Sequence, residues 1–239
     1  MKKTSNHLSS NIWKFFLFNL SQRRHFIPIL AVFFLTLPNT NAQQIGIYLG
    51  IGFLASFLLE IPSGYFADKF GHKETLVLAK VLMILSMFSF IIADSLPFFI
   101  LGSALISISF SFTSGTDSAF IHDTLIQLKR EKEFTKIMSK LLANVSIISA
   151  ILIILLPFLT NISILLPLKV NLIFDFLGLF AVLALKSPKR EGEIVEHSSF
   201  FKLVKKAANP GFYIFAIFTG AIGGFILGST AYKEVYLQS

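Results

Sequence analysis

The chain has 239 residues, of which 54% are hydrophobic and only 14% charged, with 28 phenylalanines and no cysteine. An ordinary soluble domain carries about 25% charged residues, so this composition excludes one, and it also excludes a disordered chain and a disulfide or thiolate-metal framework. A multi-pass membrane protein remains. Its expected fold is all-α, because lipid-exposed backbone must satisfy its own hydrogen bonds.

Seven apolar stretches follow one another along the chain, and each is predicted to be a transmembrane helix. They are Phe26–Asn39, Ile45–Ala67, Thr75–Ala93, Leu96–Ile121, Leu141–Leu159, Ile162–Leu185 and Phe212–Ala231. The first is short for a span, so we expect it to begin earlier and to draw on Ile12–Leu20, although the polar run Ser21–His25 interrupts it. The expected organisation is an N-terminal cytoplasmic segment (1–25), a six-helix bundle (26–185), a cytoplasmic linker (186–210), and the seventh helix with the end of the chain (211–239).

The net charge of +8 is distributed unevenly along this sequence. All but two of the 21 lysines and arginines are assigned to the N-terminus or to alternate connections, Lys80 being counted with the connection after the second span. The two exceptions are Lys169 and Lys233. By the positive-inside rule the N-terminus and these connections are cytoplasmic, which predicts a multi-pass protein of the inner or plasma membrane. The basic balance is therefore a topology signal, and no nucleic-acid partner is expected.

The connection between the second and third spans reads Gly64-Tyr-Phe-Ala-Asp68-Lys69-Phe-Gly71-His72-Lys73. Gly71 permits a tight turn into the third span, and Asp68 is an anion placed to meet a helix N-terminus or a basic partner. Lys69 and Lys73 lie near anionic headgroups. A short charged turn, which any helical hairpin needs, would account for the same residues.

This string resembles the signature loop of the major facilitator superfamily of transporters. The match holds at Gly64, Asp68, Lys69, Gly71 and Lys73, and it departs at His72, where the family usually has Arg. Two further strings are similar to a bacterial branch of the family, namely Glu60-Ile-Pro62-Ser-Gly64 and the segment from Ser114 to Leu125. The resemblance implies the six-helix N-terminal half of that fold plus one further transmembrane helix.

In the family the loop locks the outward-facing state. The resemblance implies that Asp68 contacts the second half of the protein. It also implies that His72, as the basic residue of the loop, pairs with Asp123 at the end of the fourth span. Arg is always charged whereas His titrates near neutrality, so we hypothesise a pH-sensitive lock. The simpler alternative is that His72 is a tolerated substitution.

Three acids lie within the spans, where ionisable groups are costly and usually functional. Glu60, Asp117 and Asp175 are therefore candidates for a proton or substrate pathway, with interhelical hydrogen bonding or structural locking as alternatives. The five histidines lack metal-ligand spacing, and there is no glycine-rich phosphate loop with its lysine. We therefore expect no enzymatic activity, no cofactor and no metal.

The resemblance implies a secondary active transporter that moves a small solute across the lipid bilayer by alternating access. Drug or metabolite efflux and coupling to protons stay open at this point. Family members have about twelve spans in two six-span halves, so a chain that stops after a seventh span is expected to be truncated. The alternative is a non-transporting membrane fragment, or an assembly partner for a separately encoded C-terminal half.

Overall fold

The structure is a computed structural model that describes residues 8–188 together with Ile214 and Phe218, and this part contains helices and no β-strand. The predicted all-α fold is thus confirmed. The predicted linker beyond residue 188 and the predicted seventh span lie outside the described residues, apart from Ile214 and Phe218. In chain order the elements are α2 (Asn11–Ser21), α3 (Ile27–Leu35), α4 (Ala42–Phe70), α5 (His72–Ile91), α6 (Leu96–Thr113), α7 (Thr116–Gln127), η1 (Glu131–Glu133), α8 (Phe134–Leu155), η2 (Leu156–Asn161) and α9 (Leu166–Leu183).

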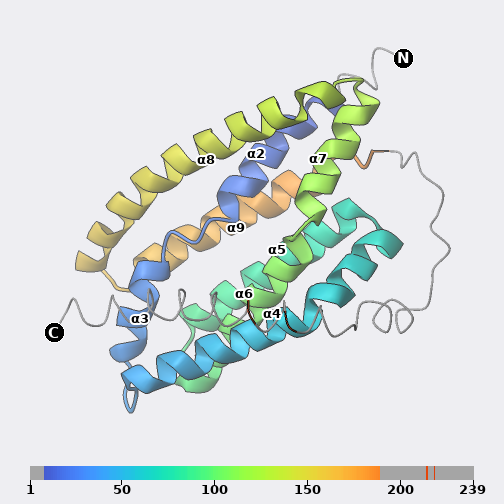
Figure 1. Ribbon diagram of the computed structural model, residues 1–239. Helices are drawn as coiled ribbons and strands as arrows, with labels where there is room; N and C mark the ends of the chain where they lie inside the picture. Colours follow the sequence, from blue (N-terminus) through green and yellow to red (C-terminus); the bar gives the residue numbers. More distant parts are fainter. Residues whose placement is uncertain (1–7, 189–213, 215–217, 219–239) are drawn as a thin grey trace.

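Five helical segments in this part of the chain are long and apolar enough to cross a membrane. They are Ala42–Phe70, His72–Ile91, Leu96–Gln127, Glu131–Asn161 and Leu166–Leu183, which match the predicted second to sixth spans in order. Figure 1 shows them as a bundle in which α5 and α6 lie centrally, α4 packs along one side, and α2 lies beside α8 and α9. The described helices therefore form one packed unit.

The predicted first span is a broken helix made of α2 and α3. Residues 22–26 separate the two pieces, because a run of polar side chains is followed by Pro28 near the start of α3. Proline fits the first turn of a helix, where its missing N–H costs nothing. The stretch before Phe26 thus belongs to the bundle, as the expected earlier start of this span requires.

The second and third spans are joined by a turn at a single glycine. Helix α4 begins at a capping box between Asn41 and Gln44 and runs for 29 residues, or roughly 44 Å at 1.5 Å per residue, which is longer than the hydrocarbon core. It ends at Gly71, whose φ of 112° and ψ of 152° belong to a region that only glycine adopts readily. Helix α5 starts at the next residue, so this glycine sets the angle between the two helices.

The fourth span was expected to be one helix but is divided into α6 and α7. Ser114 leaves helical geometry with a ψ of 122°, and Gly115 has a φ of 73°, so a new helix begins at Thr116. The broken first and fourth spans meet, since the Gln22 side-chain amide donates to Thr113 Oγ1 at 2.9 Å.

The core consists of two apolar clusters with polar residues between them. One cluster is rich in aromatic rings and includes Phe34 and Phe99, whose centroids are 4.7 Å apart. The other, at the opposite end of the bundle, contains Phe15, Phe18 and Phe120. The buried polar layer between them contains Ser21, Gln22, Arg24, His25, Lys80, Thr113, Ser149, Asn171 and Asp175.

Candidate functional site

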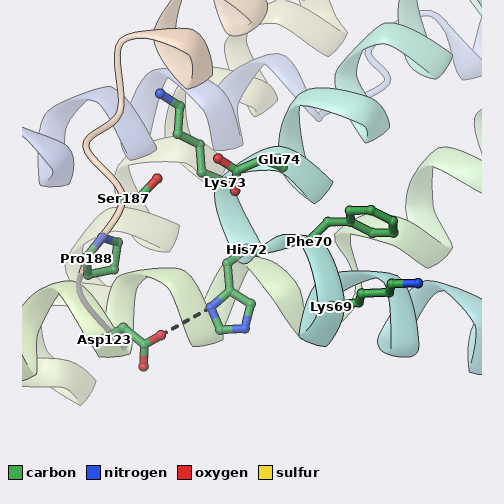
Figure 2. Close-up of a pocket in the computed structure, with 9 residues that line it drawn as sticks. Lys69, Phe70, His72, Lys73, Glu74, Asp123, Ser187 and Pro188 are labelled. Atoms are coloured by element: carbon green, nitrogen blue, oxygen red, sulfur yellow. Dashed lines mark ion pairs between the residues drawn. The ribbon is translucent and has the colours of Figure 1, made fainter. Parts of the chain in front are cut away.

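The predicted lock residues lie at one end of the bundle, which we call the motif end. It gathers the start of α2, the α4–α5 turn, the C-terminal part of α7 and the end of α9. His72, the first residue of α5, points at Asp123 on α7, with 3.2 Å between His72 Nδ1 and Asp123 Oδ2 (Figure 2). Both side chains are partly exposed, at 16% and 26%. The structure therefore brings together the two residues that sequence reasoning paired.

A small open pocket of about 220 Å³ surrounds this pair. Its charged lining mixes cations with anions, and Ser187 and Pro188, at the start of the predicted linker, form one wall (Figure 2). Lys69 points away from the pair, and its Nζ lies 5.4 Å from the centre of the Phe70 ring. The linker thus leaves the bundle directly beside the His72–Asp123 pair. The full lining is Lys69, Phe70, Gly71, His72, Lys73, Glu74, Asp123, Ser187 and Pro188.

Lys73 Nζ donates to the backbone oxygen of Leu183 at 2.9 Å. Lys14 donates to the carbonyl of Ala184 at 2.8 Å, and Asn11 exchanges two hydrogen bonds with the backbone of Lys186, at 2.8 and 3.0 Å. The last carbonyls of a helix lack partners within the helix, and cations are favourable there. Two lysines and an asparagine therefore fix the end of α9 and the start of the linker.

Gly64, Asp68, Glu60 and Asp117 do not line the pocket around this pair. Gly64 is exposed on α4, and a Cβ placed there would meet no atom within 4 Å. Asp68 and Glu60 are exposed on the same helix. Asp117 is half-buried in the first turn of α7, where its Oδ1 accepts from the backbone N–H of Ser118 at 2.6 Å. No described residue therefore approaches the backbone closely at Gly64.

Asp175, the third acid expected to line a pathway, lies in the buried polar layer and is fully enclosed. Arg24 binds it with two parallel hydrogen bonds, Nη1 to Oδ2 at 3.0 Å and Nη2 to Oδ1 at 2.9 Å. Lys80 Nζ is 3.2 Å from the same Oδ1. The carboxylate is thus held by two cations, in the bidentate geometry that makes Arg–carboxylate pairs strong.

The same two cations also satisfy the broken end of α2. Lys80 donates to the Ser21 carbonyl at 3.1 Å and to Gln22 Oε1 at 2.7 Å, so its ammonium has three acceptors. Arg24 donates to the carbonyls of Ser21 and Gln22. The interruption of the first span is therefore stabilised by side chains from α5 and from the break itself.

Sequence reasoning assigned Arg24 and Lys80 to cytoplasmic connections, and the structure corrects this. Lys80 is fully buried in α5, with an exposed fraction of 0%, and the Arg24 side chain is 2% exposed. Both were treated as topology signals, although each has its anionic partner inside the bundle. The available clue was that Lys80 follows the apolar residues Leu76–Ala79 and lies inside the predicted third span, Thr75–Ala93.

The helical bundle and its charged turn define a multi-pass α-helical membrane protein. Residues 14–238 match the model of the Major Facilitator Superfamily, and the chain belongs to this family. A curated relative is the inner membrane transport protein YajR of Escherichia coli (strain K12), which is 29% identical over 135 residues. That alignment covers 56% of this chain and 28% of the relative, so the chain matches little more than a quarter of that protein's length.

Proposed function

We propose that this chain belongs to a secondary active transporter that moves a small solute across the inner membrane by alternating access. The observation that carries the proposal is the His72–Asp123 pair at the α4–α5 turn, because it joins the second, third and fourth spans at one face of the bundle. Family membership supports transport as the class of function. The name of the similar protein, which describes inner membrane transport, supports the same direction.

The turn is proposed to act as the lock of one conformational state, with Asp68 presented to the second half of the transporter. Asp68 is exposed near the end of α4. His72 holds α5 to α7 through Asp123. Opening the motif end would separate these helices, so the strength of the pair sets part of the energy difference between the two states.

We propose further that this lock is sensitive to pH. A protonated His72 forms an ion pair with the Asp123 carboxylate, whereas a neutral ring can donate an N–H to that carboxylate but carries no positive charge to attract it. The charged groups around it are Lys69 on α4, Lys73 and Glu74 on α5, and Asp123 on α7. The lock should therefore tighten as the pH falls through the range in which histidine takes up a proton, and an arginine at this position should abolish the change.

Glu60 and Asp117 are the proposed carriers of proton coupling. Glu60 is exposed on an apolar helix and Asp117 is half-buried beside the break in the fourth span, so each can exchange protons with a cavity between two halves. Asp175 is assigned instead to structural support, because two cations hold its carboxylate in the closed interior. Of the three acids within the spans, Asp175 is therefore left out of the proposed proton pathway.

The proposed orientation places the motif end in the cytoplasm. It follows from the positive-inside rule applied to the connections that carry the lysines and arginines. These 239 residues contain no cysteine, so an introduced cysteine is the single maleimide site within them. A membrane-impermeant maleimide should label Lys132→Cys only after the membrane is opened, and Asp94→Cys in intact cells. The reverse pattern would overturn the orientation.

Transport itself is tested with the full-length protein in proteoliposomes, with ethidium as the efflux probe and pyranine as the reporter of internal pH. Imposing a proton gradient should drive ethidium movement, and ethidium should move protons in return. Glu60→Gln and Asp117→Asn should lose the proton movement, whereas Lys169→Gln, an exposed change on α9, should keep it. Ethidium movement that ignores the gradient would overturn proton coupling, and an absence of movement would overturn efflux of this probe class.

A further inference from the structure

A row of exposed lysines lies at the start of the predicted fifth span. Lys132 is in η1, Lys136 and Lys140 are in the first two turns of α8, and all three are exposed. Lys136 and Lys140 are four residues apart and share one face of α8, and Lys132 precedes them by another four residues. We call these three residues the lysine stripe. Because α8 lies at the outer edge of the bundle, beside α2 (Figure 1), the stripe is a cationic surface on the outside of the described bundle.

The face of α8 that carries the lysine stripe continues as an apolar surface. Ile147, Ile151 and Ile154 are 61%, 52% and 66% exposed. They follow Lys140 at helical spacing, so they lie on the same side of α8 as the stripe. The buried residues of α8 lie on the opposite side, and they are Leu141, Val145 and Ser149. One exposed helix face thus presents ammonium groups first and branched aliphatic side chains after them.

Two acids lie in the same segment as the lysine stripe, and both face other groups. Glu133 accepts two hydrogen bonds from the Arg130 guanidinium, at 2.9 and 2.8 Å. Glu131 Oε1 lies 3.7 Å from His122 Nε2. Lys136 is near enough to Glu133 to act on it electrostatically, but within the described part of the chain none of the three stripe lysines forms an ion pair. The positive charge of the stripe is therefore left for a partner outside the described bundle.

We propose that the lysine stripe binds the phosphate groups of anionic phospholipids, while the three isoleucines contact the acyl chains of the same lipids. Clusters of basic residues beside a membrane span attract anionic headgroups. Ile147 lies seven residues after Lys140, or roughly 10 Å along the helix at 1.5 Å per residue. The long lysine side chains can extend towards the headgroups while their own aliphatic parts stay against the apolar surface.

The order of charge and apolar surface along α8 selects a lipid as the partner. A phospholipid carries an anionic headgroup and apolar chains in the same order, so it complements the whole face. A free phosphate ion would match the lysines alone and would leave the isoleucines without a partner. The surface is separate from the His72–Asp123 pocket, because none of its residues lines that pocket. The inference thus adds a lipid-binding surface to the proposed transporter.

The test uses the full-length protein purified in dodecyl maltoside and titrated with dioleoyl phosphatidylglycerol, with the midpoint of thermal unfolding as the readout. The triple variant Lys132→Gln/Lys136→Gln/Lys140→Gln should need more than about tenfold more of this lipid for the half-maximal rise in midpoint, because each lysine near an anionic surface contributes about fivefold to affinity. The matched control Lys132→Arg/Lys136→Arg/Lys140→Arg keeps the three charges and should respond as the unaltered protein does. An unchanged response of the glutamine variant would overturn the proposal.

The neutral lipid dioleoyl phosphatidylcholine distinguishes lipid binding from packing against another part of the protein. In this lipid the glutamine variant and the unaltered protein should unfold at the same midpoint, since exposed charges contribute little to stability. High salt should remove the preference of the unaltered protein for phosphatidylglycerol, because salt screens exposed charges. If the glutamine variant were equally destabilised in both lipids, the stripe would be held by a protein contact, and the proposal would be overturned.

Discussion

Replacing Asp175 with asparagine removes the only acidic partner that the structure shows for Arg24 and Lys80 inside the described bundle. The shape of the side chain is kept, so the change isolates charge. Both cations are buried, and Lys80 is completely so. Breaking a buried ion pair by removing one partner costs about 3–5 kcal/mol, since the remaining charge is left uncompensated. At roughly 2–4 °C per kcal/mol for a chain of this size, the unfolding midpoint should fall by about 6–20 °C.

Two control variants make this prediction specific. Lys169→Gln changes an exposed charge on the same helix and should shift the midpoint by less than about 2 °C, because exposed charges contribute little. Lys80→Met leaves the Arg24–Asp175 pair intact but removes the donor to the Ser21 carbonyl and Gln22, at a cost of about 1–3 kcal/mol. The assay is thermal unfolding of the purified protein, followed by tryptophan fluorescence or by loss of the monodisperse species. If Asp175→Asn were no less stable than Lys169→Gln, the reasoning about the cluster would be refuted.

The remaining predictions concern the turn, the helix contacts and the lock. Gly71→Ala should destabilise the protein by about 1–3 kcal/mol in a denaturant titration, because φ at this residue is 112°; an unchanged midpoint would show that the turn relaxes freely. Gly178→Ala places a Cβ against Ser21 Oγ and should lower the thermal midpoint. At Gly50 an added Cβ would meet no atom within 4 Å, so Gly50→Ala should leave the midpoint equal or slightly higher. Equal effects of the two variants would contradict the close approach of α9 to α2. Lys73→Met should speed amide hydrogen exchange at the end of α9, because it removes the hydrogen bond to the Leu183 carbonyl. Lys69→Met should leave this exchange unchanged. Identical exchange rates in the two variants would show that the Lys73 hydrogen bond does not hold the end of α9. His72→Arg should alter the dependence of transport on pH between about 5 and 8, the range in which histidine titrates, and a dependence identical to that of the unaltered protein would contradict the pH-sensitive lock.

Much of the fold followed from hydropathy alone, because a stretch that must cross hydrocarbon is apolar from end to end. Helices α4, α5, α8 and α9 correspond in this way to predicted spans. The two breaks were less visible. The first break was predictable because the run Ser21–His25 is polar. The second break, at Ser114 and Gly115, lies in a run of small residues, and a hydropathy profile shows no interruption of the apolar span there.

Site residues that belong to a recognisable sequence motif could be predicted. Contacts between residues that are distant in sequence could not. His72 and Asp123 were paired through resemblance to a family, and they lie 3.2 Å apart. By contrast, Asp175 meets Arg24, a residue 151 positions away, and no helical spacing joins them. A lysine such as Lys80 looks the same to a charge count whether it faces headgroups or a buried carboxylate. Only the packing of α5 against α9 distinguishes the two cases.

The most direct test of the proposed alternating access uses Ser114→Cys in the otherwise cysteine-free chain. Ser114 is exposed at the break in the fourth span, where a cavity between two halves would lie. The rate of labelling by a membrane-impermeant maleimide from the cytoplasmic side should rise when Asp123→Asn weakens the pair with His72. Ile154→Cys, on the apolar and exposed surface of α8, should stay unlabelled in both backgrounds. Equal labelling of Ser114→Cys with and without Asp123→Asn would contradict the lock.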